Sequence, residues 1–218
     1  MTQDRPERAE RADAARNRRA ILLATEELLA RYRPEQISME QVAAAAGVGK
    51  GTVFHRFGSR MGLMHALMAE RALALTEAVS SGPPPLGPGA PAAERLFAFL
   101  DAIVDVVARN KGLLAALGHA DTTVAAKSDE DPRTAHPVYG FWHGHIADLL
   151  AAERPDLDAE LQAHILLAGL QSRSILLLLE QGEAARLAAA LHALARALLH
   201  TPIEDASTED TPAEDTTG

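Results

Sequence analysis

Residues 38–57 read SMEQVAAAAGVGKGTVFHRF, and they predict two short helices joined at Gly47. Ser38 and Gln41 have the spacing of a capping box, in which a hydroxyl and an amide satisfy free backbone N–H groups at a helix start. Gly47 suits the left-handed turn that ends a helix, and a second helix is expected over Lys50–Phe57. This pattern is typical of a helix-turn-helix, whose second helix enters the major groove of DNA.

The expected second helix carries a polar face. Its members are Lys50, Thr52, His55 and Arg56. A short helix with such a face can donate hydrogen bonds to phosphates and to the O6 and N7 acceptors of guanine. Arg60, at the start of the next helix, adds a phosphate donor beside free backbone N–H groups. The alternative is a helical hairpin packed in a core, but such a hairpin needs no cluster of exposed cations.

At these residues the sequence resembles the tetracycline-repressor (TetR) family of transcriptional regulators. The shared elements are Val42-Ala43, Ala46-Gly47-Val48, Lys50-Gly51-Thr52-Val53, Phe54-His55-Arg56-Phe57 and Ser59-Arg60. The resemblance covers residues 17 to about 67 closely and is only architectural beyond them. It implies double-stranded DNA with a palindromic operator as the partner. The residues expected to bind DNA are Ser38, Lys50, Gly51, Thr52, Phe54, His55, Arg56 and Arg60.

Two positions depart from the family pattern. Phe54 stands where the family usually has a tyrosine whose hydroxyl contacts a phosphate, so that contact is expected to be absent. Gly49 stands where a serine usually caps the recognition helix. A glycine cap is weaker than serine by only a few tenths of a kcal/mol, so the helix is expected to form. DNA binding therefore remains the prediction.

The rest of the chain is predicted to be helical. Ile21, Thr25 and Leu28 give one apolar face to a helix from about Asn17 to Tyr32, which Pro34 ends. Further helices are expected over 60–80, 92–110, 111–118, 133–153, 156–181 and 183–200, with a polar loop over 119–132. The Pro- and Gly-rich segment 81–91 marks a boundary. No segment has the alternation of a half-buried strand, so the predicted fold class is all-α.

Four regions are expected along the chain. Residues 1–16 form a flexible arm, 17–65 a three-helix helix-turn-helix domain, 66–202 a larger helical domain for ligand binding and dimerisation, and 203–218 a disordered acidic tail. Residues 1–65 carry 11 Lys and Arg against 8 Asp and Glu, whereas residues 66–218 carry 10 against 22. Although the net charge of the chain is −9, its amino-terminal part is therefore cationic and can bind phosphates locally.

Two apolar helices near the carboxyl end suggest a homodimer. The run ILLLL at 175–179 is apolar all round, and leucines repeat along one face of 183–200. This pattern resembles half of a four-helix dimer interface, a mode common in the family, although both helices could instead complete a monomeric core. The predicted interface residues are Ala168, Ser172, Ile175, Leu179, Leu187, Leu191, Leu194 and Leu198.

The resemblance also implies a pocket for a small-molecule effector inside the larger domain. Its predicted walls are the helices over 92–110, 133–153 and 157–181. The candidate lining residues are Phe97, Leu100, Ile103, Leu117, Phe141, Trp142 and His145. Composition does not separate pocket from core, because pockets are themselves mostly apolar.

Metal, cofactor and enzyme functions are not expected. His143 and His145 lie two residues apart and point to different sides of a helix, and the chain has no cysteine, so neither a zinc site nor a disulfide is predicted. His136 is also near in sequence without metal-ligand spacing. No nucleophile elbow, Gly-rich phosphate loop or HExxH motif is present.

The sequence therefore predicts a cytoplasmic, homodimeric, ligand-responsive transcriptional regulator that binds DNA as a repressor. No signal segment or membrane span is expected. An activator that binds DNA only with ligand would use the same residues. The alternative from another class is a helical small-molecule-binding dimer or enzyme whose DNA reader no longer binds.

Overall fold

The computed structural model describes residues 4–116, 137–170 and 172–201, which contain helices and turns and no strand. The all-α prediction is confirmed over these residues. The elements are α1 (Asp4–Leu29), η1 (Pro34–Gln36), α2 (Met39–Ala45), α3 (Lys50–Phe57), α4 (Arg60–Ser81), α5 (Ala92–Ala116), α7 (Pro137–Glu153), α8 (Ala159–Gly169), α9 (Arg173–Glu180) and α10 (Ala184–His200). No single helix in this described part is long and apolar enough to cross a membrane; only the bent pair α8 and α9 has the length and composition together.

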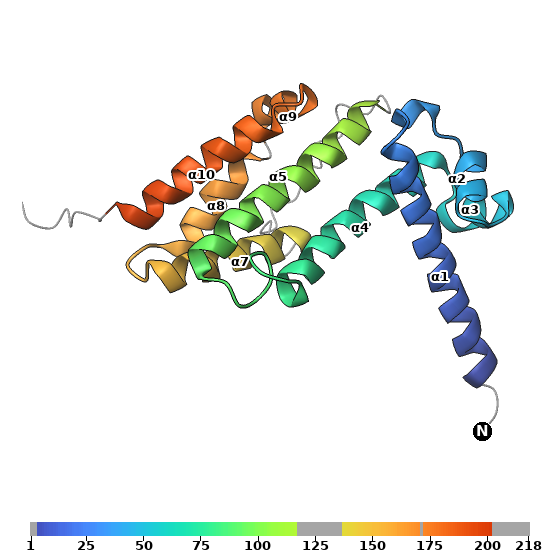
Figure 1. Cartoon of the computed structure of the whole chain (residues 1–218), viewed down its shortest axis with the longest axis horizontal. Helices are drawn as coiled ribbons and strands as arrows, with labels where there is room; N and C mark the ends of the chain where they lie inside the picture. Colours follow the sequence, from blue (N-terminus) through green and yellow to red (C-terminus); the bar gives the residue numbers. More distant parts are fainter. Residues whose placement is uncertain (1–3, 117–136, 171, 202–218) are drawn as a thin grey trace, which may run out of the picture.

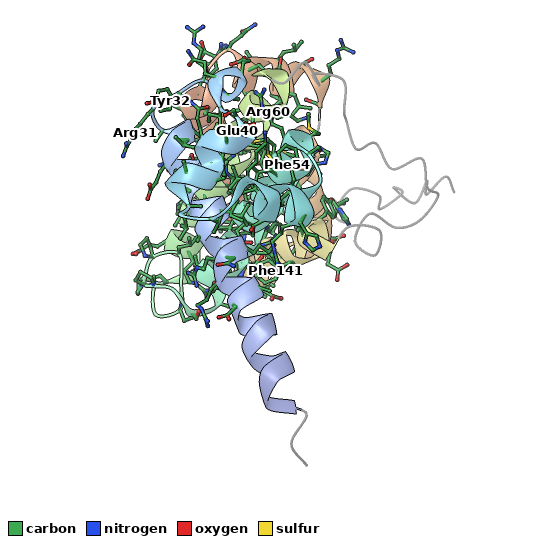
Figure 2. The ribbon with its side chains drawn as sticks, turned by 90° about the vertical axis from the view of Figure 1, so that its right-hand side faces the viewer. Arg31, Tyr32, Glu40, Phe54, Arg60 and Phe141 are labelled. Atoms are coloured by element: carbon green, nitrogen blue, oxygen red, sulfur yellow. The ribbon has the colours of Figure 1, made fainter. Side chains whose placement is uncertain are left out.

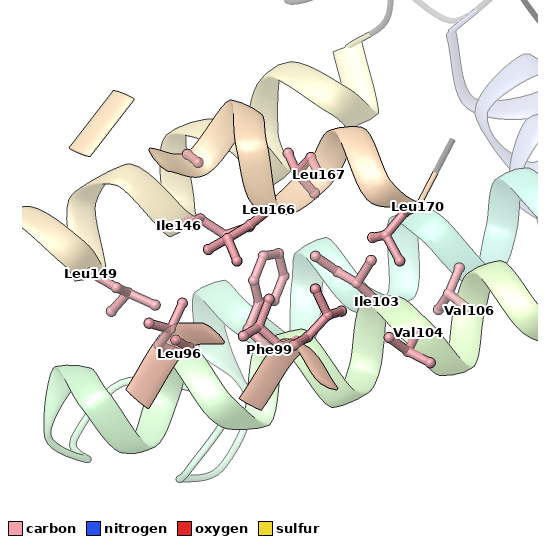
Figure 3. Close-up of a cluster of buried hydrophobic side chains, with 14 of the residues drawn as sticks. Leu96, Phe99, Ile103, Val104, Val106, Ile146, Leu149, Leu166, Leu167 and Leu170 are labelled. Atoms are coloured by element: carbon pink, nitrogen blue, oxygen red, sulfur yellow. The ribbon is translucent and has the colours of Figure 1, made fainter. Parts of the chain in front are cut away.

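The helices form two groups joined by α4. Figure 1 shows α1, α2 and α3 at one end and α7 to α10 around α5 at the other, with α4 running between them. In the larger group, buried side chains of α5 such as Leu96, Phe99 and Ile103 face Ile146 of α7 and Leu166 of α8 (Figure 3). We call this larger group the body. Its core is almost entirely aliphatic, which fits the aromatic content of 4%.

A second cluster of buried side chains lies beneath the helix-turn-helix. Ile21 of α1, Val42 of α2, Val53 of α3 and Leu63 of α4 each have 0% exposure and pack together. Leu113, near the end of α5 in the body, belongs to the same cluster and is 3% exposed. One leucine of the body is therefore part of the core of the amino-terminal domain.

Two expected helix boundaries near the amino end are wrong. The first helix begins at Asp4 rather than near Asn17, so residues 4–16 continue α1. Whether this extension is the predicted flexible arm stays a prediction. Alanine, arginine and glutamate are strong helix formers, and an existing helix propagates more easily than a new one starts. The helix ends at Leu29 rather than Tyr32, ahead of a short 3-10 turn that begins at Pro34.

Two boundaries in the body also differ from expectation. The segments 92–110 and 111–118, expected as separate helices, form the single helix α5 up to Ala116. The segment 156–181, expected as one helix, is divided into α8 and α9 because the Ser172 hydroxyl accepts a hydrogen bond from the Ile175 N–H at 3.3 Å and starts a new helix. Residues 119–132 and 133–136 lie outside the described part of the chain.

Candidate nucleic-acid interface

The turn between α2 and α3 fixes the direction of α3. The Ser38 Oγ accepts from the Gln41 N–H at 3.2 Å, and the Gln41 side chain accepts from the Ser38 N–H at 2.8 Å. Gly47 has a φ of 67°, and the Val48 N–H then donates to the Ala43 carbonyl at 3.0 Å. The capping box and the left-handed glycine turn are thus confirmed as predicted.

The predicted DNA-binding residues of α3 lie on one exposed surface. Val53 is completely buried and anchors the helix, while its neighbours face outward. The exposed members are Lys50, Gly51, Thr52, Phe54, His55 and Arg56. Gly62 lets the first turn of α4 come close to the carbonyl of Phe57, because a Cβ there would overlap that oxygen. Two local constraints therefore hold this surface outward, and its role in DNA binding stays a prediction.

Lys50 has two partners that the sequence did not suggest. Its ammonium forms an ion pair with the Glu40 carboxylate of α2 and lies 5.6 Å from the centroid of the Phe54 ring. The hydrogen bond from Lys50 holds the pKa of Glu40 below its ordinary value. Figure 2 shows Glu40 and Phe54 at this end of the molecule. A carboxylate beside Lys50 would weaken the attraction of this surface for phosphates.

Arg60 and Ser38 are placed differently from the α3 residues. Arg60 is half-buried, its guanidinium donates to the carbonyl oxygen of Pro34, and its Nε is buried without a partner. Arg60 thus ties the start of α4 to the turn after α1, and the structure does not present it as a free phosphate donor. Ser38 is half-buried at the start of α2, with its hydroxyl oxygen engaged by Gln41.

The junction between the amino-terminal domain and the body contains a buried cation. The Arg71 side chain, 7% exposed, donates to both carboxylate oxygens of Glu26 at 2.6 and 2.9 Å and to the Asn110 side-chain oxygen at 3.1 Å. These contacts join α1, α4 and α5 and hold the pKa of Glu26 below its ordinary value of 4.5. Cavities of about 440 and 390 Å³ lie beside this cluster. Sequence reasoning missed Arg71, because a lone arginine in a helix is usually solvated.

The predicted pocket residues in the described ranges all belong to the body or pack against its core, but they do not meet at one place, because the Phe97 ring faces His192 of α10 with centroids 5.1 Å apart. Leu117 lies outside the described residues. Leu100 and Ile103 are buried, whereas Phe97, Phe141, Trp142 and His145 are half-buried around the same core. His145 contacts the ring of Phe99 edge-on at 4.7 Å. Burial, followed by the charge of Arg95, lowers the pKa of His145 to about 4, so the imidazole is neutral at pH 7. The two junction cavities are lined by other residues.

The remaining histidines of interest have protein partners. The His143 Nε2 lies 3.0 Å from the Glu160 carbonyl oxygen, and the His164 Nδ1 lies 2.8 Å from the Tyr139 hydroxyl. Within the ranges that the structure describes, no group of three His, Cys, Asp or Glu side chains is arranged to hold a metal ion. His136 lies outside those ranges.

The predicted dimer residues fall into three sets, which are buried, half-buried and exposed. Leu179, Leu187 and Leu191 are buried in the core of their own chain, so little of their surface is left for a second copy. Ile175 and Leu198 are half-buried. Ala168, Ser172 and Leu194 are exposed, Leu194 at 55%. The leucine periodicity of α10 marked an apolar face correctly but did not reveal that most of this face packs inward.

The comparisons agree with the resemblance found at the helix-turn-helix. Residues 21–67 match the family model described as bacterial regulatory proteins, tetR family. The match spans α2 and α3 completely, together with the adjoining parts of α1 and α4. This part of the chain is therefore a helix-turn-helix domain of the tetR type, as predicted. No curated protein matches the chain in sequence.

Solved structures share this fold over most of the chain. A TetR transcriptional regulator from Streptomyces coelicolor is 23% identical with a TM-score of 0.56, and the match covers 83% of this chain and 97% of that one. The transcriptional regulator FadR from Bacillus subtilis, solved with stearoyl-CoA, is 14% identical with a TM-score of 0.51, covering 84% of this chain and 98% of that one. The fold of the described residues is thus that of TetR-type regulators, with an amino-terminal helix-turn-helix domain and a larger helical body.

Proposed function

We propose that this protein represses transcription by binding a palindromic operator as a homodimer, and that a small molecule bound in its body releases it from DNA. The observation that carries the proposal is the exposed polar surface of α3, held outward by the buried Val53. A recognition helix so placed can reach base edges in the major groove. The helix-turn-helix would occupy residues 17–65, and residues 66–202 would serve ligand binding and dimerisation.

Communication between the body and α3 has a physical route. Leu113 of α5 is buried among side chains of the amino-terminal domain, and Arg71 of α4 holds Glu26 of α1. A ligand that shifts α5 or α4 would therefore change the spacing of two recognition helices in a dimer. Coupling of about 1–3 kcal/mol between the two sites is enough to alter operator affinity 5- to 150-fold.

The direct test is a gel shift with the DNA immediately upstream of the gene, at several salt concentrations. Retention that falls steeply with salt indicates that Lys and Arg side chains neutralise phosphates. Transcription in the presence and absence of the purified protein then separates repression from activation. Absence of retention at low salt would reject the proposal.

Two observations support the alternative that the helix-turn-helix no longer binds DNA. The Lys50 ammonium is already paired with Glu40, and Phe54 has no hydroxyl to offer to a phosphate. Under this alternative the body would remain a small-molecule-binding dimer. The same gel shift decides between the two functions, because only a functional reader retains operator DNA with a salt-dependent affinity.

The Glu40 carboxylate gives a specific prediction. Glu40→Gln removes a negative charge next to the DNA surface and frees Lys50, so operator affinity should rise about three- to tenfold at low salt. Fluorescence anisotropy with labelled operator measures the change. Glu35→Gln is the matched control, since Glu35 is exposed in the neighbouring turn η1 and has no ion pair with Lys50. Unchanged or weaker binding of Glu40→Gln would contradict a phosphate-facing role for Lys50.

The exposed apolar side chains of α8 and α10 support a homodimer. Leu161 and Ile165 of α8 are 52% and 55% exposed, and Leu194 of α10 is 55% exposed. Ala168 continues the α8 stripe, because positions 161, 165 and 168 share one helix face. Apolar faces of two helices from each subunit can pack into a four-helix interface.

Leu194→Arg places a charge at this proposed interface and should convert the dimer into a monomer. Light scattering should change from about twice the chain mass of 23.2 kDa to one chain mass. Leu73→Arg serves as the control, because it makes the same chemical change at a residue of α4 that is 59% exposed. This variant should remain a dimer. A wild-type protein that is monomeric at micromolar concentration would refute the dimer.

A further inference from the structure

Three buried nitrogen atoms between α5 and α7 have no hydrogen-bond partner. They are Arg95 Nε, Trp142 Nε1 and His145 Nε2. Buried polar groups in folded proteins are almost always hydrogen-bonded, so an unpaired set of this kind suggests a ligand-binding role. His192 Nε2 is also without a hydrogen bond, but it lies 2.9 Å from a carboxylate oxygen of Asp101.

The three side chains occupy neighbouring turns of the two helices. Phe99 lies one turn after Arg95 on α5, and its ring meets the His145 ring edge-on at 4.7 Å. The Arg95 guanidinium is close enough to His145 to act on its titration. Trp142 precedes His145 by three residues, so both side chains lie on adjacent parts of the α7 surface.

Arg95 is half-buried, and no carboxylate of the described residues forms an ion pair with it. The Asp148 carboxylate is near enough to His145 to raise the pKa of that ring, against the lowering by burial and by Arg95. The Nε–H groups of Arg95 and Trp142 can only donate hydrogen bonds. A molecule that satisfies both must therefore offer acceptor oxygens, and an anion would also compensate the positive charge. A protonated amine would be repelled by the guanidinium, because both groups carry a positive charge.

The surroundings of these donors are apolar. Leu100 and Ile103 of α5 belong to the body core, and Phe141 of α7 packs against it. Phe141 stacks on His145 with ring centroids 6.2 Å apart. Phe141 and Trp142 are half-buried, so the core is closed less completely here than at Leu100, which is 1% exposed. The apolar part of a ligand bound here would therefore contact apolar side chains.

We propose that the effector is an organic carboxylate with an apolar body, whose carboxylate oxygens accept hydrogen bonds from Arg95 and Trp142 between α5 and α7. This inference rests on the proposed function and names the chemical class of its effector. Leu75 and Val79 of α4 belong to the same core cluster, so a ligand that separates α5 from α7 also acts on α4. Helix α4 continues from there to the helix-turn-helix.

The test uses Trp142, which is the only tryptophan of the chain and therefore reports on this site by its fluorescence. Purified full-length protein is titrated with 4-phenylbutyrate and octanoate, and with 4-phenylbutanol and 4-phenylbutylammonium as matched probes of different charge. At least one carboxylate should change the emission saturably. The alcohol and the ammonium ion should bind at least about tenfold more weakly than the carboxylate, a loss typical of a missing charge-assisted hydrogen bond.

Variants make the test specific. Arg95→Gln should weaken carboxylate binding at least about tenfold, whereas Arg173→Gln, an exposed arginine of α9, should leave binding unchanged. Circular dichroism checks that each variant folds; if Arg95→Gln does not fold, Arg95→Lys, which lacks the guanidinium fork, should still weaken binding. Absence of a response to both carboxylates, equal binding of the ammonium probe, or unchanged binding by the Arg95 variant would each overturn the proposal.

The gel shift keeps the two hypotheses apart. If the wild-type protein without ligand does not bind the operator, the proposed function is rejected, whatever the fluorescence titration shows. Retained operator binding together with a failed carboxylate titration would reject only the effector class.

Discussion

The double variant Lys50→Ala/Arg56→Ala is expected to bind the operator on the order of 100-fold more weakly at 150 mM salt, or worse. Both side chains are exposed on α3, and a homodimer would lose each contact in two half-sites. A good contact from an arginine to a base edge is worth about 1–3 kcal/mol, and each lost phosphate contact also removes counterion release. The loss of operator affinity is expected without a loss of folding, because both side chains are exposed.

Fluorescence anisotropy with labelled operator over a range of salt concentrations measures this effect. The slope of log affinity against log salt should become shallower by about 0.9 for each phosphate contact removed. Arg173→Ala/Arg186→Ala makes the same charge change at exposed positions of the body and should keep operator affinity close to wild type. Similar melting temperatures would show that all variants fold, and a loss smaller than threefold in the Lys50/Arg56 variant would contradict the assignment of α3.

The helix-turn-helix was predictable because its signals are local. The Ser38 capping box and the left-handed turn at Gly47 each act within a few residues, and both are formed as expected. In α3, Val53 is the only buried residue, and the polar residues around it are exposed. Local hydrogen bonding and a single anchor are enough to determine this part of the fold.

The direction of long polar side chains was not predictable. Arg60 has the sequence context of a phosphate donor, yet its guanidinium bonds to the carbonyl of Pro34, 26 residues away. Lys50 pairs with Glu40 across the turn between two helices. Both contacts depend on how separate elements pack, and neither residue spacing nor composition carries that information.

In the body, the sequence also did not predict which apolar side chains would be buried. Leu187 and Leu194 share one helical repeat, but Leu187 is 8% exposed and Leu194 is 55% exposed. A leucine repeat identifies an apolar face without identifying its neighbour, which can be the same chain or a second copy. The division of α8 from α9 depends on one serine cap, which the continuous apolar pattern concealed.

Arg71→Met is expected to lower the free energy of unfolding by about 3 kcal/mol, because it leaves the Glu26 carboxylate in a partly buried position without its partner. The Arg71 side chain is 7% exposed and that of Glu26 is 34% exposed, so the pair is shielded from water on one side. Urea denaturation at pH 7 measures the change. Arg18→Met is the matched control, since Arg18 also joins α1 to α4 through Glu70 but both side chains are more exposed, 37% and 40%. Its loss should stay below about 1 kcal/mol.

Acid should reduce the difference between the wild type and Arg71→Met. The pKa of Glu26 is lowered below 4.5 in the folded protein, chiefly by its hydrogen bonds from Arg71. The contribution of the pair is therefore fully present above the unfolded pKa and is lost as the pH falls through the folded pKa, because Glu26 then becomes protonated. Adding Glu26→Gln to Arg71→Met should recover part of the lost stability, since no unpaired carboxylate remains. Equal losses for Arg71→Met and Arg18→Met at pH 7 would show that burial of the Arg71 pair contributes nothing to the junction between the two domains.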